Sequence, residues 1–405
     1  MPVLNPGTLM EALDMPARSH RWCFARAFLV AALFAALARV PELAAQDEES
    51  EHRTPWRLSY FPYISGMAND GPVISARARY WQPAPYEART TYSAALDAAA
   101  GVSFRGTRHA AVRFRAPGLW KDWRVDGSLV AERLARWGYF GRGNDTEYDK
   151  DLITEATPFL FRVRRIRYEG RAEVTRRIRG PLNVAFRADV ANVKFTTLPG
   201  PSRFESDFGG DLEQDEIAGR LALVFDTRDT EFNTLRGLFA EAGVQVGDAD
   251  ESYSRLYGVI AGYYPVREGT VVAARIVGSG TGGTPTLYAR SNLPTWNDQV
   301  PVLGGEYSHR SFDTGRFVGD GVLFGNLEVR HDILPFGDLG ALSVLAFLDA
   351  GRVFEGDSFR LTTDDLHVGG GGGIALRILR STIFVFNFAG GPDGFNFSLS
   401  NGWMF

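Results

Sequence analysis

The feature of this sequence that most limits its fold is a two-residue alternation of apolar and polar side chains. In residues 321–333, apolar Leu327 and Val329 alternate with charged Glu328 and Arg330. Successive side chains of a β-strand point to opposite faces, whereas a helix repeats every 3.6 residues. The segment is therefore predicted to be a strand with one apolar face and one polar face.

The same alternation recurs along most of the chain and predicts sixteen strands. An even strand count is typical of single-chain bacterial barrels. The predicted strands are 57–65, 72–82, 90–103, 107–116, 122–137, 155–169, 181–195, 215–227, 236–248, 252–265, 269–280, 321–333, 341–354, 366–378, 382–389 and 394–405.

Two all-β architectures alternate in this way, a soluble sandwich and a membrane barrel. The predicted strands are near the roughly 9–11 residues that cross a bilayer at a tilt, while sandwich strands are usually about 5–6 residues long. Charged residues at mid-strand suit a wet lumen, and the final segment closes on Trp403 and Phe405, as an interfacial aromatic girdle would. Long polar stretches at 145–154 and 199–215 alternate with short turns. We therefore predict a 16-stranded antiparallel transmembrane β-barrel.

The N-terminus has the pattern of a cleaved signal peptide. Arg18, Arg21 and Arg26 precede an unbroken apolar run over residues 27–38, and small residues ending at Ala45 follow. The run has 12 residues, whereas a membrane-spanning helix needs about 20. Residues 1–45 are therefore predicted to be removed after export through the general secretory pathway.

The remaining chain is predicted to hold a single domain. Residues 46–56 would form a short periplasmic segment and residues 57–405 the barrel, with Met15 an alternative start to Met1. The one cysteine, Cys23, lies in the predicted signal peptide, which leaves no thiol for a disulfide or a metal site. A formal net charge of −4 argues against a nucleic-acid partner.

Several short motifs occur in order along residues 56–405. Together they resemble the C-terminal barrel of the outer-membrane assembly and translocation superfamily, also called the bacterial surface antigen family, which includes BamA and TamA. The motifs are Tyr139–Asp145, Phe225–Asp229 with Phe232-Asn233 and Arg236-Gly237, Gly304-Gly305, Arg310-Ser311-Phe312, Asn326–Arg330 and Phe347–Gly351.

The resemblance implies that an extracellular loop bearing Arg310 and Phe312 folds back into the lumen. There Arg310 would meet Glu328 and Asp349, which the alternation independently places on the polar face. A guanidinium binds carboxylates through two parallel hydrogen bonds. Without the resemblance to this family, these residues would be interpreted as ordinary solvated charges of the lumen. The motif glycine is replaced by Ser311, which would be strained if the turn required a positive φ.

The resemblance also implies a function at the bacterial outer membrane. Insertion or translocation of outer-membrane components would use a lateral seam between the first strand and the last, with Trp403 and Phe405 as a C-terminal barrel-assembly signal. The implied partners are outer-membrane lipids, unfolded outer-membrane or secreted proteins, and periplasmic chaperones. Family members usually carry periplasmic POTRA domains; segment 46–56 is too short for one, so an accessory protein would replace them. The alternative is a passive porin-like, structural or lipid-handling barrel.

The sequence offers no candidate catalytic, cofactor-binding or metal-binding residues. Its histidines form no spaced metal cluster, and it has no Gly-x-Ser-x-Gly motif, so an enzyme such as an outer-membrane lipase is not predicted. His309 and Ser311 flank Arg310 without a third member of a triad. The run Gly369–Gly373 lacks the Lys-Ser/Thr of a phosphate loop and is predicted to be a strand that permits close packing.

Overall fold

The computed structural model describes residues 54–67, 71–296, 298–356, 364–379 and 382–405. The predicted signal peptide lies outside these residues, as does most of segment 46–56. Both therefore stay predictions.

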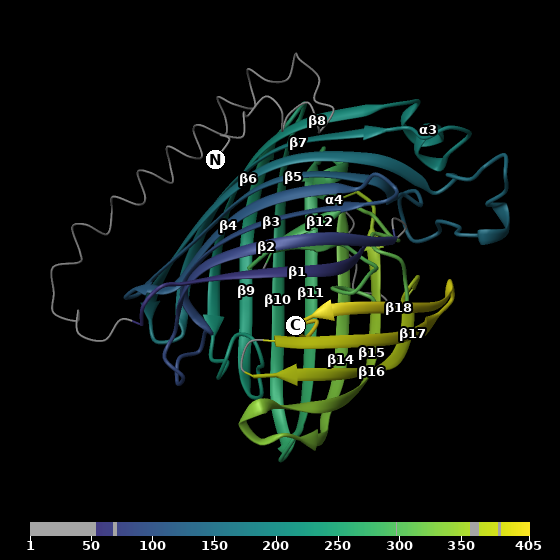
Figure 1. Ribbon diagram of the computed structural model, residues 1–405. Coiled ribbons are helices and arrows are strands. Elements are labelled where there is room, and N and C mark those ends of the chain that lie inside the picture. Colours follow the sequence, from purple (N-terminus) through teal and green to yellow (C-terminus); the bar gives the residue numbers. More distant parts are fainter. Residues whose placement is uncertain (1–53, 68–70, 297, 357–363, 380–381) are drawn as a thin grey trace, which may run out of the picture.

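The main sheet contains sixteen antiparallel strands, each hydrogen-bonded to the next along the chain. They form a tilted, strongly curved wall (Figure 1). The strands are β1 (Arg57–Met67), β2 (Gly71–Pro83), β3 (Tyr92–Ser103), β4 (Arg108–Trp120), β5 (Trp123–Gly138), β6 (Arg162–Arg179), β7 (Leu182–Thr196), β8 (Leu212–Asp226), β9 (Gly237–Asp248), β10 (Ser252–Arg267), β11 (Thr270–Gly283), β14 (Gly321–Pro335), β15 (Gly340–Phe354), β16 (His367–Ile378), β17 (Thr382–Gly391) and β18 (Gly394–Asn401).

The predicted fold class and strand count are confirmed, with two ranges placed wrongly. The sixth strand begins at Arg162 rather than residue 155 and continues to Arg179. The last strand ends at Asn401 rather than at residue 405. Gly402 has a φ of +113°, a conformation that strands do not use, and it turns the chain away from the sheet.

The wall is apolar outside and polar inside, the reverse of a soluble protein. On β14, the side chains of Leu327 and Val329 are 45% and 43% exposed, whereas Glu328 and Arg330 are 1% and 4% exposed. The same pattern recurs on β8 and β15. An apolar outer surface suits a lipid environment, and the polar groups face one another across the lumen.

The connections between strands differ in length at the two ends of the sheet. The long connections that follow β5, β7, β11 and β15 leave the sheet at the same end, because alternate connections of an antiparallel meander share an end. We call this the loop end and the opposite one the turn end. The last strand runs toward the turn end.

The longest connection, residues 284–320, enters the space enclosed by the sheet (Figure 1). We call it the lumenal loop. It contains helix α4 (Leu287–Arg290) and a hairpin of β12 (Asn292–Thr295) and β13 (Asp298–Pro301). Its Trp296 lies 6.2 Å, between ring centroids, from Phe239 near the turn end.

The other helical segments are short. In the residues that the structure describes, they are α3 (Arg203–Phe208), η2 (Lys150–Leu152) and η3 (Gly337–Leu339). In the described part of the chain, no helix has the length and apolar character needed to cross a membrane.

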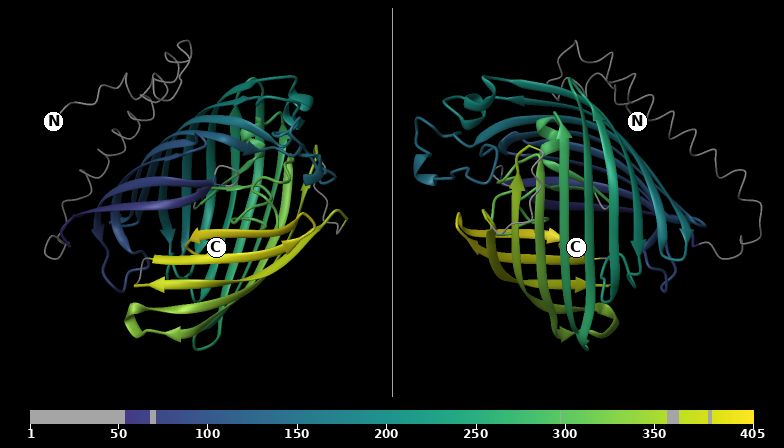
Figure 2. Two further views of the ribbon diagram at one scale, coloured as in Figure 1. Left: turned by 45° about the vertical axis from the view of Figure 1, so that its right-hand side comes forward. Right: turned by 180° about the vertical axis from the view of Figure 1, so that it is seen from behind.

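The sheet is not closed. β1 and β18 are its two edges, and among the described residues they form no ladder with each other. Figure 2 shows the purple β1 and the yellow β18 as the outermost strands of the curved wall. We call the opening between these two edges the seam.

Candidate functional site: a lumenal loop held by arginine

Arg310 joins the lumenal loop to two neighbouring strands of the wall. Its Nε and Nη2 donate to the two carboxylate oxygens of Asp349 at 2.9 and 2.7 Å, and its Nη1 donates to Glu328. Its backbone N–H also donates to Asp349, at 3.0 Å. Glu328 lies on β14 and Asp349 on β15, and these strands are adjacent in the sheet. The guanidinium thus spans two strands with geometry that is specific for arginine.

The ion pairs of Arg310 are fully buried. Arg310, Glu328 and Asp349 have almost no exposed surface, and the guanidinium carbon lies 3.5 Å from the ring centroid of Phe347. Burial alone would lower the pKa of Arg310, but its hydrogen bonds to Asp349 and the charges of Glu328 and Asp349 raise it above its usual range. Arg310 therefore stays charged, and its burial depends on its two carboxylate partners.

Phe312 fills an aromatic cluster beside these ion pairs. Its ring centroid lies 4.6 Å from that of His309 and 5.1 Å from that of Phe317, and Phe317 stacks on His367 at 3.8 Å. The structure therefore brings together all four residues predicted at this site, Arg310, Phe312, Glu328 and Asp349. We call these four residues the loop lock.

Ser311 is not strained, because it does not adopt a positive φ. It packs instead against two glycines of the wall. A Cβ atom at Gly369 would lie 2.1 Å from the Ser311 Oγ, and one at Gly391 would lie 2.7 Å from the Ser311 Cβ. Gly369–Gly373 lies in β16, as predicted, and the first glycine of this run provides room for the loop.

Four further arginines hold the lumenal loop and were not predicted as site residues. Each projects from the wall and donates to one or two backbone carbonyls of the loop. The alternation places arginines on the lumen face, but the partner carbonyls depend on the loop's path. The bonds are Arg187 to Thr295 at 3.3 Å, Arg220 to Pro294 at 2.7 Å, Arg255 to Ala289 and Asn292 at 2.7 and 2.9 Å, and Arg275 to Tyr307 at 2.7 Å.

The last strand also contacts the loop lock. Asn396 on β18 donates from Nδ2 to the carbonyls of Arg310 and Phe312, at 3.0 and 3.1 Å. β18 has a strand neighbour on one side only. The lumenal loop therefore supports this edge strand from inside the barrel.

Trp403 and Phe405 lie in the lumen, so the prediction that they belong to the last strand is wrong. Trp403 donates from Nε1 to Asn233 at 2.8 Å, and the guanidinium carbon of Arg330 lies 4.5 Å from its ring centroid. The Phe405 ring packs against the guanidinium of Arg275. The cause is the turn at Gly402, which redirects both aromatic residues inward from the end of β18.

The histidine and the serine that flank Arg310 are not hydrogen-bonded to each other in the described residues. The Nε2 of His309 lies 3.1 Å from the His367 carbonyl oxygen, and the Ser311 hydroxyl has no hydrogen-bond partner among the described residues. In the described ranges, no group of three or more His, Cys, Asp or Glu side chains is placed to bind a metal ion.

Comparison with known proteins defines the family. Residues 93–402 match the Omp85 superfamily domain, so the chain belongs to the Omp85 superfamily. This result confirms the resemblance drawn from the motifs. No curated protein matches the sequence.

Solved structures with similar folds are barrels of this superfamily. BamA from Haemophilus ducreyi lacking POTRA domains 1–3 has a TM-score of 0.53 and 12% identity, with 87% of this chain and 70% of that chain covered. CdiB from Escherichia coli has a TM-score of 0.55 and 12% identity, with 86% and 63% covered. CdiB from Acinetobacter baumannii has a TM-score of 0.50 and 11% identity, with 87% and 66% covered. The chain is thus an outer-membrane barrel of a superfamily with general roles in assembly and translocation.

Proposed function

We propose that this barrel inserts or translocates polypeptides through the seam between β1 and β18. The observation that carries the proposal is the pair of unpaired strand edges in an otherwise continuous sheet. An exposed edge presents a row of backbone donors and acceptors, which a client strand can extend by β-augmentation.

The side chains at the seam support an apolar client. Tyr60 and Ile64 on β1 and Phe395 and Phe397 on β18 are all exposed. A transmembrane strand carries apolar side chains on its outer face, so it would continue the lipid-facing surface of both edges.

The lumenal loop would control how far the seam opens. Asn396 ties β18 to the carbonyls of Arg310 and Phe312, and Arg310 is itself fixed to β14 and β15. Opening at β18 therefore requires either the release of Asn396 or a movement of the loop.

Export of the barrel and delivery of its clients are also part of the proposed function. The predicted signal peptide would direct the chain through the general secretory pathway, and Trp403 and Phe405 would serve as the barrel-assembly signal. Periplasmic chaperones or an accessory protein would bring unfolded outer-membrane or secreted clients to the turn end. No step requires catalysis or a cofactor.

The first test is depletion of this protein in its own host, followed by quantitative proteomics of the outer membrane. Loss of other barrels, or of one secreted protein, is the expected result and identifies the client. An unchanged proteome would reject the proposal in favour of a passive or lipid-handling barrel, for which lipid asymmetry would be the next measurement.

A cysteine pair tests the seam itself. Ser59→Cys with Ser398→Cys would cross-link β1 to β18 when the edges meet, and no other cysteine is present outside the predicted signal peptide. The matched control is Asn387→Cys with Ser398→Cys, which joins strands that are already paired. In the depleted host, the oxidised seam pair should fail to restore client levels while the control pair restores them. Restoration by both pairs would show that the seam need not open.

A further inference from the structure

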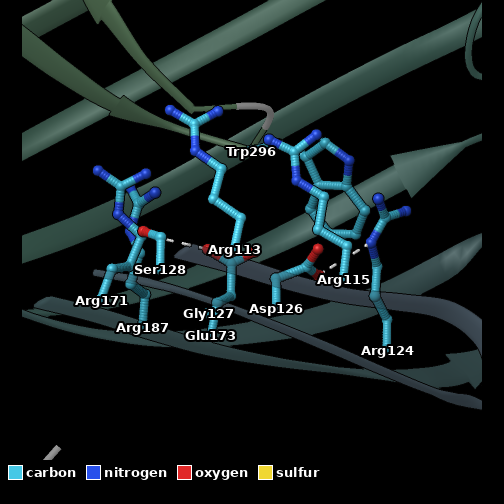
Figure 3. Close-up of a pocket in the computed structure, with 10 residues that line it drawn as sticks. All are labelled: Arg113, Arg115, Arg124, Asp126, Gly127, Ser128, Arg171, Glu173, Arg187 and Trp296. Atoms are coloured by element: carbon cyan, nitrogen blue, oxygen red, sulfur yellow. Dashed lines mark hydrogen bonds and ion pairs between the residues drawn. The ribbon is translucent and has the colours of Figure 1, made fainter. Parts of the chain in front are cut away.

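A cavity lies in the inner face of β4–β7, away from the loop lock. Its lining includes Arg113, Arg115, Arg124, Arg171 and Arg187. Figure 3 shows these arginines, which come from β4, β5, β6 and β7, together with Trp296 of the lumenal loop.

The lining is rich in arginine. It contains five arginines and two carboxylates, Asp126 and Glu173, a formal surplus of three positive charges. Both carboxylates already have partners, since Asp126 accepts from Arg124 at 3.1 Å and Glu173 accepts from Arg220 at 2.7 Å. Three carboxylates just outside the lining offset this formal surplus, since Glu231 accepts from Arg124, and Asp189 and Glu169 accept from Arg171.

Arg187 is poorly bonded for a buried cation. Its side chain is 2% exposed, and its nearest carboxylate oxygens, on Asp189 and Glu173, are 3.4 and 3.7 Å from its Nε. Its Nε and Nη2 have no hydrogen-bond acceptor among the described residues. A buried cation with unused donors is costly, so an additional acceptor would stabilise it.

Trp296 adds a third unused donor to the cavity lining. Its indole Nε1 is buried and has no acceptor among the described residues, while its backbone N–H donates to Glu241 at 2.8 Å. The backbone bond fixes the hairpin tip above the wall. The unused groups of Arg187 and Trp296 are donors, so a ligand that bonds them presents acceptors; the nearest unused acceptor, Asp189 Oδ2, lies 3.4 Å from the Arg187 Nε without a hydrogen bond.

We propose that this cavity binds a phosphate group. A phosphate presents several acceptor oxygens in a tetrahedral arrangement and carries negative charge that complements the buried guanidinium of Arg187. Guanidinium groups bind phosphate through paired hydrogen bonds, and the Trp296 N–H supplies a further donor. The group is either free inorganic phosphate or the headgroup of an anionic phospholipid. The site does not depend on the function proposed for the seam.

The test is calorimetric titration of the full-length mature barrel with inorganic phosphate in neutral detergent. Loss of a charge-assisted hydrogen bond should weaken phosphate binding by about tenfold in Arg187→Gln. Arg113→Gln provides a second variant, since Arg113 is exposed to the lumen and its loss does not threaten folding. The control is Arg352→Gln, which alters an arginine of β15 that does not line the cavity. Heat-modifiable mobility in SDS gels verifies that each variant is folded.

A parallel titration with short-chain phosphatidic acid in the same detergent separates the two sources. If phosphate binding weakens in Arg187→Gln and Arg113→Gln but not in Arg352→Gln, the site is supported and its ligand is the free phosphate ion. If only phosphatidic acid binds, and its binding weakens in the same two variants, the site is supported and its ligand is a lipid headgroup. Absence of binding to both probes, or equal binding by all variants, overturns the proposal.

Discussion

Arg310 shows how a single buried cation can depend on the fold around it. Its two carboxylates come from neighbouring strands, and its backbone N–H shares one of them. A buried ion pair contributes little net stability relative to an apolar replacement, but the loss of one partner leaves an uncompensated charge. The value of this arrangement lies in the position of the loop that it specifies.

Arg310→Ala should therefore release the lumenal loop without preventing barrel formation. The substitution leaves Glu328 and Asp349 buried with fewer partners, which should destabilise the docked loop by about 3–5 kcal/mol. We expect higher single-channel conductance in planar bilayers and faster proteolysis within residues 284–320. Arg352→Ala, which alters an ion pair of β15 with a half-exposed aspartate, should behave like the wild type. Unchanged conductance in Arg310→Ala would refute the loop lock.

His309 gives the docked loop a pH dependence. Burial lowers the pKa of His309 below 6.5, its ordinary value, despite the opposing charge of Asp349. A histidine held neutral in the folded state binds a proton more readily when undocked. Its stabilising contribution is thus complete above that ordinary pKa and decreases as the pH falls below it. Conductance should rise in acidic buffer for the wild type, and His309→Gln should reduce this rise. A rise of equal size in both proteins would assign the effect to other groups.

At the scale of elements, β16 is adapted to the loop that lies on it. Gly369 faces Ser311, where a Cβ atom would meet the Oγ at 2.1 Å, whereas a Cβ atom at Gly390 of β17 would meet nothing within 4 Å. Gly369→Ala should therefore displace the loop tip, with a cost of about 1–3 kcal/mol from overpacking. We expect Gly369→Ala to lose its compact, fast-migrating form in SDS gels at a lower temperature than the wild type. Gly390→Ala is the matched control, and equal shifts in both variants would contradict this account.

The edge strand β18 should loosen when its link to the loop is removed. Asn396→Ala deletes two hydrogen bonds to carbonyls of the loop, and each deletion leaves a carbonyl with fewer partners. Amide hydrogen exchange in β18 should become faster, while exchange in β10 stays the same. Ser398→Ala, on the same strand and face, removes one weak contact of 3.4 Å and serves as the control. Equal exchange rates in both variants would show that the loop does not support β18.

The sequence was sufficient to predict the strands because the alternation is imposed locally by the environment on each side of the wall. It misplaced β6, where apolar residues before Arg162 such as Phe159 and Phe161 belong to a turn and an aromatic contact. It also continued β18 past Asn401, since Trp403 and Phe405 keep the alternation after the chain has turned. Only the φ of Gly402 distinguishes the two outcomes.

The candidate site was partly predictable for a related reason. The partners of Arg310 lie on regular strands, so the two-residue alternation predicts the face of the sheet on which each of their side chains lies. The arginines that hold the lumenal loop bind backbone carbonyls, for example Arg255 with Ala289 and Asn292. A carbonyl has no residue-specific pattern in the sequence, and its position depends on the whole path of the loop.

At the scale of the whole molecule, stability and function have opposite requirements at the seam. Every other pair of neighbouring strands in the main sheet is joined by an antiparallel ladder, which makes a folded barrel resistant to detergent. The edge between β1 and β18 lacks this protection, so thermal unfolding should begin there. A seam that can open to admit clients is therefore also the least stable edge of the barrel.

The mature protein should therefore show heat-modifiable mobility in SDS gels, with a conversion temperature that depends on the seam. Unboiled protein should migrate as a compact barrel and boiled protein as an extended chain. Oxidised Ser59→Cys/Ser398→Cys should convert at a higher temperature than its reduced form, because the cross-link restrains the edge strands where unfolding starts. Oxidised Asn387→Cys/Ser398→Cys should shift less, because β17 and β18 are already paired. Identical mobility of boiled and unboiled wild-type protein would contradict a stable barrel, whereas equal shifts in the two cysteine pairs would place the start of unfolding away from the seam.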